Sequence, residues 1–279
     1  MRKQRNPAVD SVKSVGRVSS SSRGAASSYQ EKLVRYLIVN ADDFGQSTGI
    51  NKGVIQAHEE GIVTSASLMV RWPAAAEAAA YARNRKELSV GLHVDLCEWM
   101  FSGYEWVPVY QVVSLQDARG VRAEVERQLG AFRQFLGKGP THIDSHQHVH
   151  REEPARSILL EISGKLGVPL REFNPRICYC GDFYGQTEYG SPFQEGISIE
   201  GFVNLLTKLK PGITEVSCHP GVTDDPELRS MYRLERGAEV STLCDPKVHQ
   251  SIKEKGIICR SFRDMPDRAS WTVPSLTSP

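Results

Sequence analysis

From Leu33 onward, short runs rich in Val, Ile and Leu alternate with stretches of helical periodicity, and this alternation constrains the fold more than any other feature. It is typical of parallel strands joined by crossover helices. Seven runs are expected to be strands: 36–40, 65–70, 89–94, 141–145, 168–171, 214–218 and 257–262. The expected helices lie between them, at about 48–60, 74–85, 120–136, 153–166, 199–209 and 246–255. The sequence therefore predicts an α/β barrel. An open doubly wound sheet is the alternative, because periodicity does not show whether the first and last strands meet.

The two ends of the chain depart from this alternation. Residues 1–32 are rich in Ser and basic side chains and have few large apolar ones, so we expect a disordered tail. Residues 266–279 are rich in Pro, Ser and Thr and are expected to form a loose C-terminal tail. The barrel is then expected to occupy 33–265.

Charge and cysteine content narrow the classes of partner. Lys and Arg number 34 and Asp and Glu 33, so the net charge of +1 gives no bias toward nucleic acid or an anionic membrane. No run approaches the roughly 18 to 20 apolar residues of a membrane-spanning helix. The six cysteines include no C-x-x-C pair, which favours free thiols and a cytoplasmic location.

Polar and titratable side chains gather where the expected strands end, which is where α/β folds build their active sites. Asp42 and Asp43 follow the first strand, His93 ends the third, and His219 follows the sixth. The fourth strand leads into segment 142–150, which holds four of the chain's eight histidines. We therefore expect one site at this edge of the sheet.

The composition of that site indicates a metal ion. His142, Asp144 and His146 occupy alternate positions, so an extended strand would place them on one face. Imidazole and carboxylate groups are the ligands of hydrolytic divalent ions. The alternatives are histidines that are individually hydrogen-bonded in the core, or a His-rich tract that binds metal without catalysis.

Asp42 and Asp43 form a second unusual feature, since two adjacent carboxylates at the end of an apolar strand repel each other unless a cation is near. One could ligate a metal while the other acts as a general base. For one of the two, a solvated turn or the N-cap of the helix that begins near Ser47 is an equal interpretation.

Taken together, these motifs resemble the YdjC-like carbohydrate deacetylases, a family that includes chitooligosaccharide deacetylases. The resemblance runs in the family's order between about residues 34 and 264. It is carried by VNADDFG at 39–45, GIVTS at 61–65, GLH at 91–93, HIDSHQHVH at 142–150 and CHPG at 218–221.

The resemblance implies an irregular (β/α) barrel related to that of the polysaccharide deacetylases. In this sequence the barrel would have about seven strands. It also implies one divalent metal ion, Mg²⁺ or Zn²⁺, and hydrolysis of an N-acetyl group from an amino sugar. The implied metal ligands in this sequence are Asp43, His93 and His146. Asp42 would be the general base, and His219 would protonate the leaving amine. Family members are often dimeric, which leaves a homodimer open.

Supporting roles are expected for residues around these five. Asp144 or His148 would orient a ligand imidazole through its other nitrogen. Arg171 would orient Asp42 or form a surface ion pair. Aromatic residues gather in two loop-like segments, 99–110 and 179–193, where they would contact sugar rings or pin the loops.

Two other functions fit the same residues. The spacing of His146 and His148 is similar to the paired histidines of binuclear barrels, so a metal-dependent phosphoesterase or another amidohydrolase is an alternative. A non-catalytic binding protein that acts through its basic tail is a second alternative, disfavoured by the intact candidate site.

Overall fold

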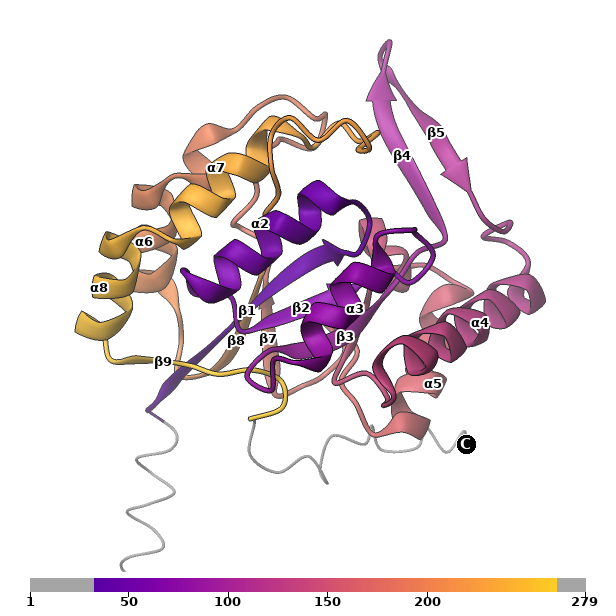
Figure 1. Ribbon diagram of the computed structural model, residues 1–279, viewed down its shortest axis with the longest axis horizontal. Helices are drawn as coiled ribbons and strands as arrows, with labels where there is room; N and C mark the ends of the chain where they lie inside the picture. Colours follow the sequence, from indigo (N-terminus) through magenta and orange to yellow (C-terminus); the bar gives the residue numbers. More distant parts are fainter. Residues whose placement is uncertain (1–32, 265–279) are drawn as a thin grey trace, which may run out of the picture. The chain divides into compact units, whose positions relative to one another are not determined.

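The computed structural model describes residues 33–264, and a parallel sheet lies at their centre (Figure 1). The sheet runs in the order β6-β3-β2-β1-β8-β7, with β9 also paired to β1. Its strands are β1 (Arg35–Phe44), β2 (Ser65–Leu68), β3 (Ser89–Val94), β6 (Ile143–Ser145), β7 (Ile177–Cys180), β8 (Gly212–Cys218) and β9 (Ile257–Cys259). The path does not return from β7 to β6, and the curled sheet forms a half-barrel. The predicted irregular α/β barrel of about seven strands is confirmed in this form.

Helices form the outer layer. They are α2 (Thr48–Glu59), α3 (Ala75–Arg83), α4 (Ala118–Leu136), α5 (Ala155–Leu166), α6 (Ile199–Lys208), α7 (Leu234–Leu243) and α8 (Pro246–Glu254). Neighbouring helices follow one another round the sheet, α5 against α4, α4 against α3, α3 against α2 and α2 against α7 (Figure 1). Two 3₁₀ helices, η1 (His146–Arg151) and η2 (Gln194–Ile197), complete the set. No helix within residues 33–264 combines the length and apolar character needed to cross a bilayer.

The strand predictions were wrong or incomplete in three places, and one of them is β7 at Ile177–Cys180, a strand that was not predicted. The expected strand at 168–171 contributes a single bridge, from Leu170 to Ile143, because Pro169 has no N–H to donate to a ladder. Residues 97–111 form an antiparallel hairpin of β4 (Cys97–Ser102) and β5 (Glu105–Gln111) that projects from the sheet (Figure 1), rather than a loop. Its two-residue turn holds Gly103 and Tyr104 at positive φ. Tyrosine seldom occupies such a turn position, so nothing in the sequence clearly indicated the hairpin.

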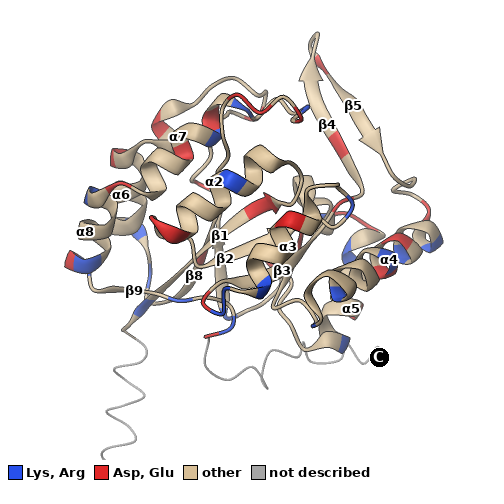
Figure 2. Cartoon of the chain, viewed as in Figure 1, with Lys and Arg blue, Asp and Glu red and all other residues tan. Residues whose placement is uncertain are grey.

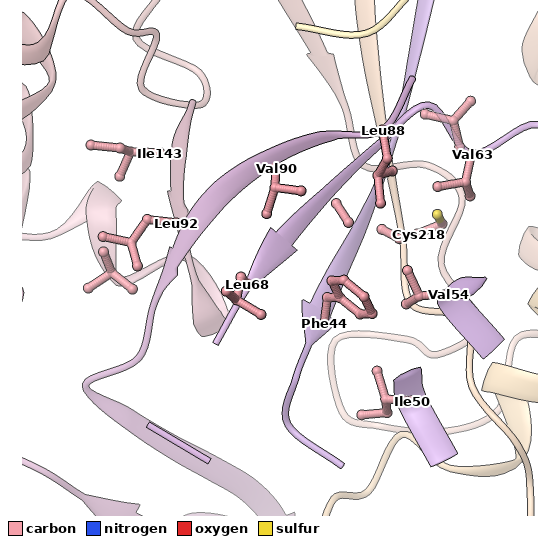
Figure 3. Packing of buried hydrophobic residues seen from close by; sticks show 14 of the residues in the cluster. Phe44, Ile50, Val54, Val63, Leu68, Leu88, Val90, Leu92, Ile143 and Cys218 are labelled. Atoms are coloured by element: carbon pink, nitrogen blue, oxygen red, sulfur yellow. The ribbon is translucent and has the colours of Figure 1, made fainter. Parts of the chain in front are cut away.

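Helix α2 packs its buried side chains against the end of β1. Ile50 and Val54 of α2 point toward Phe44, the last residue of β1, and all three are fully buried (Figure 3). Gly53, on the same helix, lies very close to Gly221. A Cβ added to Gly53 would stand 2.3 Å from the backbone nitrogen of Gly221. Helix α2 is thereby packed against the loop that follows β8.

Charged side chains of both signs are mixed along α4, whereas the carboxyl end of β1 is acidic (Figure 2). That acidic end is buried, since Asp42 and Asp43 are 3% and 1% exposed. The fold thus places two carboxylates inside the molecule at the end of its central strand. The tails expected at 1–32 and 266–279 lie outside the described residues.

Candidate metal centre and active site

A cavity of about 390 Å³ opens at the carboxyl ends of the parallel strands. The five residues predicted as the site all line it: Asp42, Asp43, His93, His146 and His219. They come from β1, β3, the start of η1 and the residue after β8. Parallel strands bring their carboxyl ends to one edge, so positions far apart in sequence meet here.

A β-bulge explains how adjacent aspartates reach one cavity. In a regular strand, Asp42 and Asp43 would point to opposite faces. Ala41 pairs with Ala66 and Phe44 with Leu68, so two residues of β1 stand opposite one residue of β2. Asp43 takes φ 63°, in the left-handed region. The bulge therefore re-aims one carboxylate, a recognised device next to active sites.

Asp43, His93 and His146 form a buried cluster of metal-capable atoms. Asp43 Oδ1 lies 3.3 Å from His93 Nε2 and 3.0 Å from His146 Nδ1. The ligand atoms of the three residues lie within 4.8 Å of one another. His146 Nε2 is buried without a hydrogen-bond partner in the structure, and Glu98 Oε2 lies 3.7 Å from it. Two imidazoles and a carboxylate, with a nitrogen left free, suit a divalent ion with open positions.

Second partners orient two of these side chains. Asp144 Oδ1 lies 2.8 Å from His93 Nδ1, which leaves His93 Nε2 facing Asp43. Arg236 Nη2 donates to Asp43 Oδ2 at 2.7 Å, which leaves Oδ1 toward the histidines. Of the two candidates for orienting an imidazole, Asp144 occupies that position, whereas His148 lies beside His150 and Glu172.

The electrostatics of the cluster favour positive charge between the carboxylates. Burial alone would raise the pKa of Asp43, but Arg236 and His146 outweigh it and hold that pKa well below its usual value. Burial likewise opposes a charge on His93, but Asp144 and Asp43 raise its pKa to about 9. The pKa of His146 lies well above its usual value, because Asp43 and Glu98 outweigh the burial that lowers it. A cation bound here would meet the same carboxylates.

Asp42 is held by Arg171 and Asn40. Arg171 donates to Asp42 Oδ2 and Oδ1 at 2.6 and 2.8 Å, and Asn40 Nδ2 donates to Oδ1 at 2.8 Å. Arg171 is buried and also contacts Asp144 and Glu215, each at 2.8 Å. The alternative of a surface ion pair for Arg171 is therefore wrong, and its position beside Asp42 is as expected.

His219 is the fifth predicted site residue, and it also lies near Asp42 Oδ2. Its Nε2 lies 3.8 Å from Asp42 Oδ2, and its ring lies 5.4 Å from those of Tyr184 and Tyr232. Burial lowers the pKa of His219 to about 4, against the opposing effects of Asp42 and Asp43. The resting ring is therefore neutral near pH 7.

His142 has a structural place instead of a ligand position. Its ring stacks on Phe262 with centroids 3.8 Å apart, and its Nε2 lies 3.0 Å from Ser67 Oγ. Asp144 also accepts a hydrogen bond from Ser67 Oγ, so alternate residues do share a face as expected. His142, Asp144 and His146 therefore do not form the expected row of three metal ligands, because His142 is hydrogen-bonded and stacked in the core. For His142, the alternative of a hydrogen-bonded core histidine is correct.

Several lining residues were not singled out from the sequence as site residues. Glu98 comes from the hairpin and Arg236 comes from α7. Neither the hairpin nor α7 was predicted, and hydrophobic periodicity does not reveal that a charged residue is buried. The aromatic residues of the two segments lie in two kinds of place. Trp106, Tyr179 and Tyr184 line the cavity, whereas Phe183 is fully buried against Phe202.

Known proteins match this chain over most of its length. The family model described as YdjC-like protein matches residues 36–254. A carbohydrate deacetylase of Geobacillus stearothermophilus is 33% identical over 257 residues, which cover 83% of this chain and 98% of that protein. A chitooligosaccharide deacetylase of Serratia marcescens is 30% identical over 261 residues, which cover 84% and 100%.

Solved structures share the fold. A protein of Enterococcus faecalis V583, provisionally described as a cellobiose-phosphate cleavage protein, superposes with a TM-score of 0.66 at 26% identity over 82% of this chain and 98% of that one. The Bc1960 peptidoglycan N-acetylglucosamine deacetylase superposes with a TM-score of 0.52 at 13% identity over 85% and 95%. The second likeness extends to the fold alone.

Proposed function

Because this chain belongs to the YdjC-like family, we propose that it is a metal-dependent hydrolase that removes an N-acetyl group from an amino sugar and releases acetate. The observation that carries the proposal is the buried Asp43, His93 and His146 cluster beside a second carboxylate, Asp42, held in place by Arg171. The relatives named carbohydrate and chitooligosaccharide deacetylase support the substrate class. We take the substrate to be an oligosaccharide or glycoconjugate that contains N-acetylglucosamine.

Asp43, His93 and His146 would hold one divalent ion, Mg²⁺ or Zn²⁺, which supplies Lewis-acid polarisation of the acetyl carbonyl and lowers the pKa of water. Asp144 and Arg236 would keep two of the ligands in position through the atoms that do not face the cluster. The three buried side chains and the free His146 nitrogen support this ligand set.

Asp42 would act as the general base. Arg171 and Asn40 fix its carboxylate, so one oxygen can take the proton of the attacking water without a change of rotamer. A proton transfer of this kind typically contributes about 10² to 10⁴ in rate. The positive charge of Arg171 offsets the negative charge of the Asp42 carboxylate, which still has lone pairs that can accept a proton.

His219 would return the proton to the leaving nitrogen. Its ring is neutral at rest, so it would acquire its proton during the reaction. The resting 3.8 Å between His219 Nε2 and Asp42 Oδ2 is too long for a hydrogen bond, so the two groups would have to come closer for His219 to receive the proton taken from water. When the tetrahedral intermediate collapses, the carbon–nitrogen bond breaks and the amine leaves with that proton. The acetyl carbon keeps the oxygen of the water, and the acetic acid so formed releases its remaining proton to become acetate.

The cavity wall supports a sugar as the bound molecule. Trp106 and Tyr184 present aromatic surface, and Gln186, Thr187 and Glu188 bring polar groups to the same cavity. The rival binuclear reading loses support, because His146 and His148 belong to different clusters. We also propose that residues 33–265 form the catalytic domain, and that it works in the cytoplasm, consistent with six free cysteines.

The test is acetate release from N-acetylglucosamine oligomers of one to six units. Metal-stripped protein is resupplied with Mg²⁺, Zn²⁺, Mn²⁺ or Ni²⁺, with Asp42→Asn as the inactive variant and the exposed Asp224→Asn as its matched control. Acetate that depends on metal and disappears only in Asp42→Asn supports the proposal. No acetate from protein that binds an ion would rule out these substrates.

A further inference from the structure

A second group of metal-capable side chains, His148, His150 and Glu172, adjoins the same cavity, which His148 lines. Glu172 Oε1 stands 3.6 Å from His148 Nδ1 and 3.6 Å from His150 Nε2. These separations are too long for hydrogen bonds. They match ligands of one ion, because atoms about 2.1 Å from a tetrahedral centre lie about 3.4 Å from each other.

The nitrogens that face Glu172 have no other partner in the structure. His150 is fully buried, and its Nε2 makes no hydrogen bond. Its Nδ1 lies 2.6 Å from Ser145 Oγ, and in the tautomer that donates from Nδ1 the lone pair of Nε2 is free. His148 Nδ1 is also buried and unbonded. Two such nitrogens are costly to leave unsatisfied, and a cation that accepts both lone pairs would remove that cost.

The backbone directs His148 away from the first cluster. Gln147 and His148 take φ of 48° and 55°, which breaks the 3₁₀ helix directly after His146. His146 therefore faces Asp43, while His148 faces Glu172, which itself has φ 68°. The two clusters share no residue, so an ion in each would be mononuclear, unlike a pair bridged at about 3.5 to 4 Å.

Arg151 orients the carboxylate of this second group. Its Nε donates to Glu172 Oε1 and Oε2 at 2.9 and 3.0 Å, and its Nη2 donates to Oε1 at 2.5 Å. A cation that takes Oε1 would displace Nη2 from that oxygen and leave Oε2 to the guanidinium, whose charge is screened because the side chain is 45% exposed. Arg151 and His148 line both the main cavity and an adjoining one of about 350 Å³.

We propose that His148, His150 and Glu172 form a second metal site for a borderline divalent cation such as Zn²⁺. Two histidines and a glutamate are a known open ligand set for zinc, with a position left for a further ligand. His148 lines the cavity, so that position can take a hydroxyl or carboxylate oxygen of a bound sugar. This last role rests on the proposed function, whereas metal binding itself does not.

The test counts metal ions in the full chain. Metal-stripped protein is equilibrated with Zn²⁺ alone, freed of unbound ion by gel filtration, and analysed for zinc per chain. About two equivalents are expected for the unmodified chain, falling to about one in His148→Asn and in Glu172→Gln. Asn tolerates the left-handed backbone at 148, so that variant is the least disruptive. The exposed His249→Asn is the matched control and should keep both equivalents.

His146→Asn separates this site from the first one. It should lose one equivalent and retain the one that depends on His148, and Co²⁺ absorption spectra of the two single variants should differ. One equivalent in the unmodified chain, or two that are insensitive to both His148→Asn and Glu172→Gln, would overturn the proposal. Acetate release is measured on the same samples, so absence of deacetylation with an intact His148-dependent equivalent would count against the proposed function alone.

Discussion

Arg171 and Asp42 are joined by two parallel hydrogen bonds, from Nη1 to Oδ2 at 2.6 Å and from Nη2 to Oδ1 at 2.8 Å. The same guanidinium contacts Asp144, which in turn holds His93. One buried arginine thus connects the proposed base to the residue that orients a proposed metal ligand. Its planar fork matters as much as its charge, since a lysine cannot bond a carboxylate through two parallel donors.

Replacing Arg171 with Lys should therefore keep the charge and lose the geometry. We expect kcat for acetate release to fall by about 10- to 100-fold with a smaller change in KM, because Asp42 is no longer fixed. Steady-state kinetics check this, and the control is Arg127→Lys, at an exposed arginine that pairs with Glu124. An unchanged kcat in folded Arg171→Lys would show that the paired hydrogen bonds do not matter.

Asp144→Asn should weaken metal binding more than it disturbs the fold. The amide cannot hold His93 as a carboxylate does, and loss of such a partner typically costs about 10- to 100-fold in metal affinity. Calorimetric titration of the ion into stripped protein measures this, and the exposed Asp224→Asn should bind as the unmodified chain does. Equal affinities in the two variants would contradict the role given to Asp144.

His219→Asn should separate chemistry from metal binding. His219 lies outside the Asp43, His93 and His146 cluster, so the ion should still bind. The turnover rate should fall by about 10² to 10⁴, the usual contribution of a positioned proton donor. Zinc content and acetate release are measured on one sample. Loss of the ion together with activity would place His219 among the ligands instead.

Part of this site could be predicted because parallel strands share an edge. Asp42, Asp43 and His93 lie at or just after the ends of apolar runs. The prediction that they lie close together therefore requires only that these runs are neighbouring parallel strands. The β-bulge that directs both aspartates into one cavity could not be predicted in this way. It depends on the positive φ of Asp43, which is a local property of the folded strand. Arg236 was missed because nothing in its sequence surroundings shows that a charged residue of α7 is fully buried.

The His-rich segment shows the same limit. Alternation placed His142 and Asp144 on one face, and both do reach Ser67 Oγ. The extended pattern then ends at Ser145, and the left-handed residues 147 and 148 send the following histidines to another group. Periodicity predicts which residues share a face only for as long as the strand continues.

His142 also gives the fold a dependence on pH. Burial lowers its pKa to about 3, whereas an unfolded histidine titrates near 6.5. Between those values the unfolded chain binds a proton that the native chain does not, so the free energy of unfolding falls as pH drops below about 6.5. The contribution of His142 is about 1.4 kcal/mol per pH unit.

The comparison with His142→Gln isolates this effect. Glutamine can keep the hydrogen bond to Ser67 but does not titrate, so denaturant-derived stability should depend less steeply on pH between about 6 and 4. The exposed His249→Gln should retain the full slope. Parallel curves for His142→Gln and the unmodified chain would mean that His142 is not held neutral.

Gly53→Ala tests how tightly α2 is packed against the loop that carries His219. Alanine is the better helix former by about 1 kcal/mol. At this position, however, its Cβ would stand 2.3 Å from backbone atoms of Gly221, which cannot move aside as a flexible side chain would. We expect a net loss of about 1 to 3 kcal/mol in the free energy of unfolding.

The matched change, Gly130→Ala in α4, meets no atom within 4 Å and should raise stability by up to about 1 kcal/mol. Thermal and urea unfolding of the two variants give the opposite signs that this packing requires. Gly53→Ala should also lower acetate release, because relief of the clash moves the backbone two residues after His219. A stabilised, fully active Gly53→Ala would show that helix and loop can separate without disturbing the site.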